Sequence, residues 1–192
     1  MQEFIKSHFE KFINLFGSIK VTDNQKNKID IYQGIECVCD IIKKQSKVDG
    51  KLLFIGNGGS AAIASHMAID FWKNGGVKAM AFNDSSLLTC IGNDFGYKHV
   101  FEKPIEAFSL KNDVLFAISS SGKSENILNG VKAAQAKGCG VITLSGFSGD
   151  NPLCSMGVYN FYVPSQEYGH VEVIHQYICH CILDAVIKFR NS

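Results

Sequence analysis

The sequence predicts one α/β domain over residues 1–192, in which helices flank both faces of a five-stranded parallel sheet and two further helices come first. Three observations lead to this three-layer fold. From Lys51 onward, apolar runs of strand length alternate with helical patterns, which is typical of parallel strands joined by right-handed crossovers. A glycine-rich turn and a serine-rich turn each follow one of these runs directly. No internal repeat or low-complexity segment interrupts the chain, so no domain boundary is expected.

The first part of the chain, residues 1–48, predicts two amphipathic helices. Residues 1–18 and 28–47 each place apolar side chains along one helical stripe: Phe4, Ile5, Phe9, Phe12, Ile13 and Phe16 in the first, and Ile31, Ile35, Val38 and Ile42 in the second. These helices carry more aromatic surface than they can bury on each other. Packing on the chain's own sheet and packing on a partner subunit are both open alternatives.

The remainder, residues 51–192, contains the alternating elements. Strands are expected at 52–55, 77–82, 114–119, 141–145 and 158–163, and helices at 60–73, 97–108, 124–137 and 168–189. Five such strands commonly adopt the flavodoxin-like order 2-1-3-4-5, whose switch point lies between the first and third strands. The loops that leave those two strands are the glycine turn at 56–60 and the serine turn at 119–124. We therefore expect both turns to meet over one crevice.

The serine turn lies within VLFAISSSGKSEN, residues 114–126. Its hydroxyls, from Ser119, Ser120, Ser121 and Ser124, lie at the carboxyl end of a strand and at a helix N-terminus, a place that suits an anion. Short hydroxyls without carboxylates favour a phosphate ester over a metal. A capping role alone would need one serine rather than four. A nucleotide-binding P-loop is excluded because its first glycine would fall on Ala117.

The glycine turn reads Gly-Asn-Gly-Gly-Ser from Gly56, and it includes Asn57, Gly58, Gly59 and Ser60. Its glycines permit positive φ and allow the backbone to approach a ligand, while Ser60 can cap the next helix or bind the ligand. A dinucleotide-binding fingerprint would need a third glycine where Ala61 stands, and no acidic residue closes the following strand. A dinucleotide is therefore not expected.

Titratable side chains concentrate on two of the expected helices. His66 and Asp70 are four residues apart and share a face, and the final helix carries Glu172, His175 and His180. The flanking cysteines and isoleucine predict that His180 is buried. The structural alternatives to a functional role are that His66 and Asp70 form an exposed surface pair and that His180 is a hydrogen-bonded core residue. If the two helices meet, two histidines with two carboxylates suit Zn²⁺ or acid–base chemistry equally well.

Composition narrows the class of protein. The formal net charge is +1 and no basic run occurs, so neither a nucleic acid nor a membrane surface is an expected partner. No apolar segment is long enough to span a bilayer, and no cleavable leader is recognisable. The 7 cysteines include no Cys-x-x-Cys pair, and most of them sit in apolar surroundings, as reduced core thiols do. We expect a soluble, cytoplasmic protein.

Four segments carry a family resemblance: GNGGSAAIASHMAIDF, CIGNDFGYKHVF, AISSSGKSENIL and EVIHQYICHCI. Together they closely resemble the sugar isomerase (SIS) domain and, within it, the phosphoheptose isomerases, over nearly the whole chain. The resemblance implies a homotetramer with active sites at subunit interfaces. In that arrangement residues 1–48 serve oligomerisation, and residues 51–192 bind the sugar phosphate.

The resemblance also implies an activity, namely conversion of sedoheptulose 7-phosphate to D-glycero-D-manno-heptose 7-phosphate through a cis-enediol. This reaction would supply heptose for surface polysaccharide, such as a lipopolysaccharide core or a capsule. By position, Ser119, Ser121 and Ser124 would hold the phosphate, and Asn57, Gly58, Gly59 and Ser60 would line the crevice. Asn93 and Asp94 would contact sugar hydroxyls. His66 and His180 match zinc ligands, with one Zn²⁺ per subunit, and His180 also matches a catalytic residue.

The sequence departs from the family at several positions. Asp70 stands where glutamate is usual, Glu172 where glutamine is usual, and Gly169 where aspartate is usual; a glycine-arginine-tyrosine segment is replaced at residues 73–76. We expect His180 to be one catalyst, and Asp70 and Glu172 to share the other role, the metal or contact with substrate. The alternative is a non-catalytic SIS-domain protein that binds a replication initiator or senses a phosphosugar. The presence of both His66 and His180 counts against it.

Overall fold

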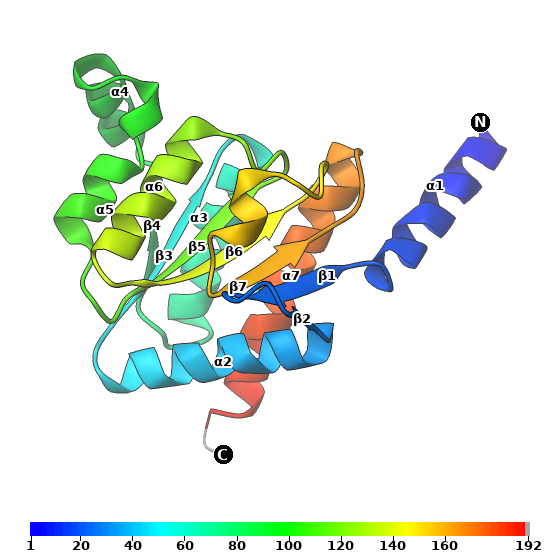
Figure 1. The fold of residues 1–192 in the computed structure, drawn as a ribbon, viewed down its shortest axis with the longest axis horizontal. Coiled ribbons are helices and arrows are strands. Elements are labelled where there is room, and N and C mark those ends of the chain that lie inside the picture. Colours follow the sequence, from blue (N-terminus) through cyan, green and yellow to red (C-terminus); the bar gives the residue numbers. More distant parts are fainter. Residues whose placement is uncertain (191–192) are drawn as a thin grey trace.

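The computed structural model describes residues 1–190, so the last two residues of the expected domain lie outside the described part. Figure 1 shows helices packed around one central sheet. In chain order the elements are α1 (Gln2–Phe16), β1 (Lys20–Asp23), β2 (Lys28–Ile29), α2 (Ile31–Lys47), β3 (Leu52–Gly56), α3 (Gly59–Lys73), β4 (Ala79–Ala81), α4 (Ser85–Asp94), the 3₁₀ turn η1 (Tyr97–His99), α5 (Glu102–Phe108), β5 (Val114–Ser119), α6 (Glu125–Ala136), β6 (Gly140–Ser145), the 3₁₀ turn η2 (Pro152–Ser155), β7 (Tyr159–Tyr162) and α7 (Tyr168–Lys188).

The sheet formed by the described residues has seven strands in the order β2-β1-β7-β6-β5-β3-β4. Strands β4, β3, β5, β6 and β7 are mutually parallel, and they are the five that the sequence predicts. Strand β1 pairs antiparallel with β7, and β2 pairs antiparallel with β1. The expectation of a purely parallel, five-stranded sheet is therefore corrected: the sheet is mixed, and a hairpin extends it at the β7 edge.

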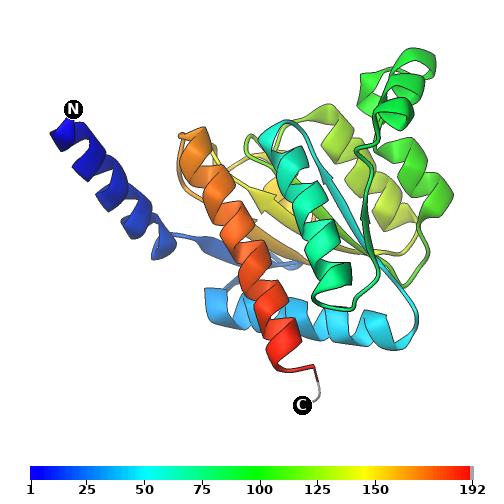
Figure 2. The same ribbon diagram turned by 180° about the vertical axis from the view of Figure 1, so that it is seen from behind.

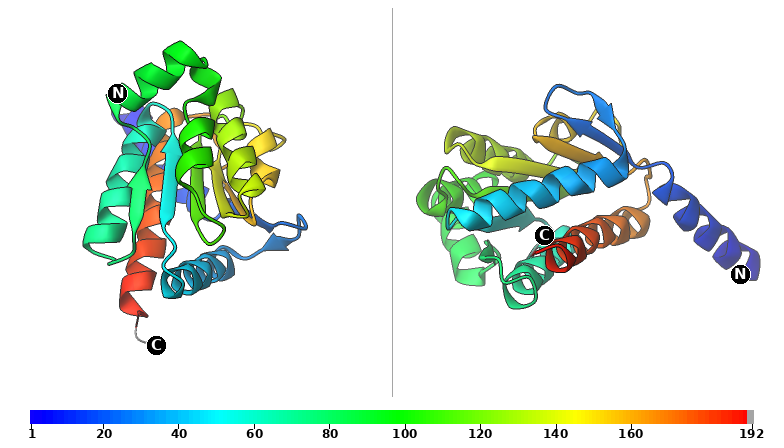
Figure 3. Two further views of the ribbon diagram at one scale, coloured as in Figure 1. Left: turned by 90° about the vertical axis from the view of Figure 1, so that its left-hand side faces the viewer. Right: turned by 90° about the horizontal axis from the view of Figure 1, so that it is seen from below.

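Two helical layers cover this sheet (Figures 1 and 3). Successive side chains along a strand point to opposite faces, so a single strand can contribute to the core beneath both layers. On β3, Leu52 and Phe54 join the core beneath α2, α3 and α7. Leu53 and Ile55 on the same strand face the opposite way, into the core beneath α5 and α6. This period of two on a strand buried throughout is expected where helices cover both faces of a parallel sheet. The three-layer prediction is confirmed.

Two helical predictions differ from the structure. The helix expected at 97–108 is a short 3₁₀ turn followed by α5, and α4 was not predicted at all. The start of α4 is fixed by Asp84, whose Oδ1 accepts a hydrogen bond from the Leu87 backbone N–H at 3.0 Å. In the same way, α2 begins at Ile31 rather than residue 28, because Asp30 accepts from the Tyr32 N–H at 2.8 Å.

Helix α1 projects from the body of the molecule (Figures 1 and 2). Only its second half packs against the core, through partly buried Phe12, Leu15 and Phe16, and no side chain within Gln2–Phe16 is fully buried. Phe4 and Phe9 are 70% and 63% exposed. The hairpin β1–β2 separates α1 from α2, so the two leading helices do not pair within the chain. The chain's own sheet therefore covers only part of the apolar stripe of α1.

Two expectations from composition can be compared with the structure. All seven cysteines lie in the described part of the chain, where each is a free thiol. Burial raises the pKa of Cys39 to about 11 and that of Cys179 to about 12, as in unreactive core thiols. Within residues 1–190, no helix combines the length and the apolar character that crossing a membrane requires.

Candidate active site

A cavity of about 250 Å³ opens at the carboxyl ends of β3 and β5. These strands are parallel neighbours, with Gly56 paired to Ile118, so the turns that follow them emerge side by side. The prediction that the glycine and serine turns meet over one crevice is confirmed. The lining consists of both turns and the start of α7: Asn57, Gly58, Gly59, Ser60, Ser119, Ser120, Ser121, Ser124, Tyr168 and Glu172.

The two central glycines of the glycine turn differ in their roles. Gly58 has a φ of 54° and a ψ of −123°, a backbone conformation that favours glycine, and its carbonyl accepts from Ala61 and Ala62 in the first turn of α3. At Gly59 an added Cβ would meet the carboxylate at the end of the flexible Glu172 side chain, so a larger residue there would displace that carboxylate. The turn therefore brings the N-terminus of α3, the positive end of its dipole, to the cavity wall.

The serine turn is held by its own hydrogen bonds. The Gly122 N–H lies 3.1 Å from the Ser119 carbonyl and 3.2 Å from its hydroxyl, and the Lys123 N–H donates to the Ser121 hydroxyl at 3.3 Å. Among the described residues, the buried Ser120 hydroxyl has no partner, and Ser124 precedes α6 without capping it through its side chain. These two hydroxyls are placed to bind a ligand that carries acceptor oxygens.

Asn57 is oriented by residues that the sequence analysis missed. Asn57 and Asn126 exchange two amide hydrogen bonds, at 2.9 and 2.8 Å, and the Tyr97 hydroxyl donates to the Asn57 side-chain oxygen at 3.2 Å. Tyr168, the first residue of α7, was also missed as a lining residue. The only sign in the sequence that Asn126 belongs to the site is its position just after the serines, in the first turn of α6. Its partner on another loop is not visible in the sequence.

A histidine–carboxylate cluster lies between α3 and α7, outside the lining of this cavity. The two helices run side by side in the same direction (Figure 2), and they bring together His66, Asp70 and His180. His66 Nε2 lies 3.2 Å from His180 Nε2 and 3.4 Å from Asp70 Oδ2. Tetrahedral Zn²⁺ with bonds of about 2.0–2.1 Å holds its ligand atoms roughly 3.3 Å apart. The two separations from His66 Nε2 match this value, and all three donor atoms lie within 4.8 Å of one another, so the group could hold Zn²⁺.

The structure corrects the expectation that His180 is buried. His180 is partly exposed at the edge of the buried stripe of α7, where it faces α3. His175 is the buried histidine, with 0% exposure, and its Nε2 donates to the carbonyl of Ser145 at 3.0 Å. Burial lowers the pKa of His175 to about 4, because the charged imidazolium would lose its hydration. His175 is thus a neutral residue that joins α7 to the end of β6.

Glu172 lies apart from the histidines. It precedes His180 by eight residues on α7, a rise of about 12 Å along the helix. Its carboxylate instead lies against Gly59 at the cavity wall. The structure therefore separates the predicted four-residue ligand set into His66, Asp70 and His180 at one place and Glu172 at another. The sequence already predicted that Glu172 and His180 lie two turns apart on nearly the same helical face, but it could not show which of the two faces His66 and Asp70.

Asn93 and Asp94 lie on α4, away from the cavity lining of the same chain. Both side chains are exposed, and the Asn93 amide donates to Asp94 Oδ1 at 2.8 Å. Helix α4 stands above the body of the molecule at the end that carries the cavity (Figure 1). Within the described chain, these two residues are not brought together with the other predicted site residues.

Comparisons with known proteins agree with these features. A sequence model of the SIS domain matches residues 21–146. A phosphoheptose isomerase from Histophilus somni is 38% identical over 179 residues, which cover 90% of this chain and 89% of that protein. Another, from Aneurinibacillus thermoaerophilus, is 33% identical over 100% of this chain and 98% of that protein. Among solved structures, a phosphoheptose isomerase from Neisseria gonorrhoeae superimposes with a TM-score of 0.82 at 33% identity, covering 96% of this chain and 98% of that one.

Proposed function

Since the chain belongs to the SIS domain family and resembles phosphoheptose isomerases over nearly its whole length, we propose that it isomerises sedoheptulose 7-phosphate to D-glycero-D-manno-heptose 7-phosphate. The structural observation that carries this proposal is that α3 and α7 run side by side from a cavity at their N-terminal ends to a histidine–carboxylate cluster. At one end lies the cavity formed by the glycine and serine turns, and further along lies the cluster of His66, Asp70 and His180.

The distance along α3 and α7 between the cavity and the histidine cluster is comparable with the length of a seven-carbon sugar phosphate. From Gly59 to His66 the rise along α3 is about 10 Å, and from Glu172 to His180 the rise along α7 is about 12 Å. An open-chain heptose 7-phosphate measures about 10 Å from phosphorus to C1 by ordinary bond lengths. A phosphate at the serine turn therefore allows the carbonyl end to reach the histidines.

The phosphate is proposed to bind on the serine side of the cavity. The free hydroxyls of Ser120 and Ser124 and the N-terminus of α6 offer donors there, with Ser119 and Ser121 shaping the turn. Asn57, Gly58, Gly59 and Ser60 form the opposite wall, where Glu172 already lies against Gly59. Asn93 and Asp94 remain proposed contacts to sugar hydroxyls.

The chemistry requires proton transfers at C1 and C2 and at the two oxygens. Removal of a proton from C1 leaves an electron pair that forms the C1–C2 double bond as O2 gains a proton. A proton returned to C2 and the proton lost from O1 then complete the aldehyde. We assign Asp70 to the carbon-bound proton and His180 to the oxygens. His66, Asp70 and His180 would hold one Zn²⁺ per subunit, which when bound would polarise the substrate oxygens.

Three broader features belong to the same proposal. The exposed apolar stripe of α1 supports a homotetramer with active sites at subunit interfaces. The heptose product suits synthesis of surface polysaccharide, in the cytoplasm where sugar phosphates are made. A non-catalytic protein that binds a replication initiator or senses a phosphosugar is not favoured, because a binding role would not need the clustered His66, Asp70 and His180.

The test is a coupled assay of the purified protein with sedoheptulose 7-phosphate, with and without Zn²⁺. We expect turnover that falls by about 100-fold or more in His180→Ala, because general acid–base catalysis contributes at least that much. Gln176→Ala, on the same helix, is the control and should retain activity. If the wild type shows no turnover while the sugar phosphate still raises its thermal unfolding temperature, the protein binds phosphosugars without isomerising them.

A further inference from the structure

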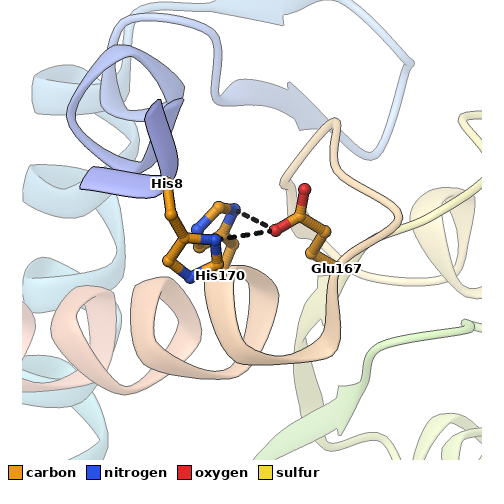
Figure 4. Close-up of side chains that lie close together, drawn as sticks. All are labelled: His8, Glu167 and His170. Carbon is orange, nitrogen blue, oxygen red and sulfur yellow. Dashed lines mark ion pairs between the residues drawn. The ribbon is translucent and has the colours of Figure 1, made fainter. Parts of the chain in front are cut away.

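A second histidine–carboxylate group lies where α1 meets the start of α7, away from the proposed active-site cluster. It consists of His8 on α1, Glu167 just before α7, and His170 in the first turn of α7 (Figure 4). We propose that this group binds a divalent transition-metal ion of the Zn²⁺ class and thereby fastens α1 to α7. The inference does not rest on the proposed isomerase activity.

The geometry of the three side chains favours a metal over a simple ion pair. His8 Nδ1 and His170 Nδ1 each lie 3.3 Å from the same oxygen, Oε2 of Glu167. That separation exceeds the roughly 2.9 Å of a good N–H···O hydrogen bond, and it matches the roughly 3.3 Å between the ligand atoms of tetrahedral zinc. Imidazole nitrogens with one carboxylate oxygen are a ligand set that Zn²⁺ commonly takes.

The surroundings suit a metal site in which one ligand, His170, is held by burial and the other two are open to solvent, so that an ion can enter. The side chain of His170 is only 4% exposed, whereas those of His8 and Glu167 are 44% and 43% exposed. The two imidazole rings lie with their centroids 4.1 Å apart and are tilted by 36° to each other, and both present Nδ1 to the same carboxylate oxygen. Lys11 Nζ lies 3.7 Å from the other oxygen of Glu167, which leaves Oε2 free to face the imidazoles. Water can occupy a fourth position on the solvent side.

A metal ion at this site would hold α1 against α7. Within Gln2–Phe16 no side chain is buried, and near this site the helix contacts α7 mainly through His8, Lys11 and the ring of Phe12 beside His170. A bound ion would add strong bonds at that weak junction. The same first turns of α7 carry Tyr168 and Glu172 in the cavity lining. The ion would therefore fix α1 relative to one wall of the proposed active site.

The two clusters are separate sites. His170 and His180 are ten residues apart on α7, a rise of about 15 Å, so one ion cannot bridge them. Metal binding at one place can consequently be removed without touching the ligands of the other. This separation makes the proposal testable whether or not the His66, Asp70 and His180 cluster binds metal.

The experiment measures Zn²⁺ per chain after equilibrium dialysis, together with the visible absorption of Co²⁺ titrated into the metal-free full chain. We expect His8→Ala to lose one metal equivalent, and Glu167→Gln to weaken Co²⁺ binding at this site by at least about tenfold, since even outer-shell changes cost 10–100-fold. Lys11→Ala is the matched control. It removes another α1 contact to Glu167 but no ligand, so it should keep the full stoichiometry.

A second measurement reports on the junction itself. Amide hydrogen exchange within α1 should slow on addition of Zn²⁺ in the wild type and in Lys11→Ala, but not in His8→Ala. The proposal is overturned if His8→Ala binds as much metal as the wild type, or if the only equivalent bound is the one lost in His66→Ala. Loss in His8→Ala with no change in His66→Ala would uphold this site while counting against zinc at the proposed active centre.

Discussion

At the scale of single residues, we expect the charge of Glu172 to affect ligand binding in the cavity. Among the described lining residues it is the one charged side chain, and its carboxylate lies against Gly59 at the N-terminus of α3. A carboxylate there stabilises the helix N-terminus, but it also repels a phosphate bound in the same cavity. The serine side and α6 are then the part of the cavity best suited to the phosphate.

Replacing Glu172 with glutamine separates these effects. We expect Glu172→Gln to tighten the binding of inorganic phosphate about fivefold, equivalent to roughly 1 kcal/mol, because one like charge near the site is removed. Since Glu172 lies about two helical turns from His180, kcat should change little. Isothermal titration with phosphate and the coupled assay measure the two quantities. A large fall in kcat with unchanged phosphate affinity would instead make Glu172 a catalytic residue.

The sequence predicted the positions of site residues that local structure fixes, but not the exposure of residues that depends on tertiary packing. Ser119, Ser120, Ser121 and Ser124 could be assigned to the crevice because a strand end and a helix start fix their position locally. The exposure of His180 could not, because it depends on how α7 faces α3. The periodicity of α7 predicts which of its side chains share one apolar face, but it does not predict which neighbouring element packs on each side of the helix.

At the scale of elements, the cavity depends on a contact between two loops that are distant in the chain. Asn57, after β3, and Asn126, at the start of α6, exchange both amide hydrogen bonds. Asn126 is 3% exposed, so these bonds replace hydration that its amide cannot recover in the folded state. This pair fixes the distance between the glycine turn and the serine turn.

Removal of Asn126 should therefore affect both stability and binding. We expect Asn126→Ala to lower the free energy of unfolding by about 2 kcal/mol, since Asn57 loses both hydrogen bonds to the Asn126 amide, and to weaken phosphate binding. Urea denaturation and phosphate titration measure the two effects. Asn129→Ala, on the same helix, is the matched control; it removes a partly exposed amide that donates to the Lys98 carbonyl at 3.1 Å, and it should cost less stability and leave phosphate binding unchanged. Equal losses in both variants would mean that helix α6, not the amide pair, is responsible.

Elements with long apolar patterns were predicted, and short ones were missed. Strands β3, β5 and β6 are buried almost throughout and have distinct patterns, whereas β1 and β2 have only four and two residues and read KVTD and KI. Strand β1 forms by pairing with the edge of β7, which is distant in the chain, so a local sequence pattern does not reveal it. Helix α4 was predictable in principle, because Asp84 caps it and Leu87, Leu88 and Ile91 repeat at helical spacing.

At the scale of the whole molecule, α1 is the element that the single chain leaves least covered. Phe4, Phe9 and Ile13 are 70%, 63% and 65% exposed on a helix that projects from the body (Figure 2). Apolar side chains gathered on one protruding helix are typical of a surface that another subunit covers. This is the structural basis for the proposed tetramer.

A charge on that stripe should disrupt assembly. We expect the wild type to have the mass of four chains by light scattering, and Phe9→Asp to shift the protein to smaller species, because a carboxylate would be buried without a partner. Asn14→Asp adds the same charge on the polar side of α1 and should leave the mass unchanged. A tetramer that persists in Phe9→Asp would exclude this stripe as the interface.

The two margins of the sheet bear on aggregation. One edge strand, β2, has two residues, and the other, β4, has three. Short edges offer few unpaired backbone groups on which a foreign strand could build, so the sheet is poorly suited to growth from chain to chain. The hairpin that the sequence did not reveal thus gives the longer β7 a partner within its own chain. Contacts between copies are left to the helices, where side chains rather than backbone hydrogen bonds decide which partner fits.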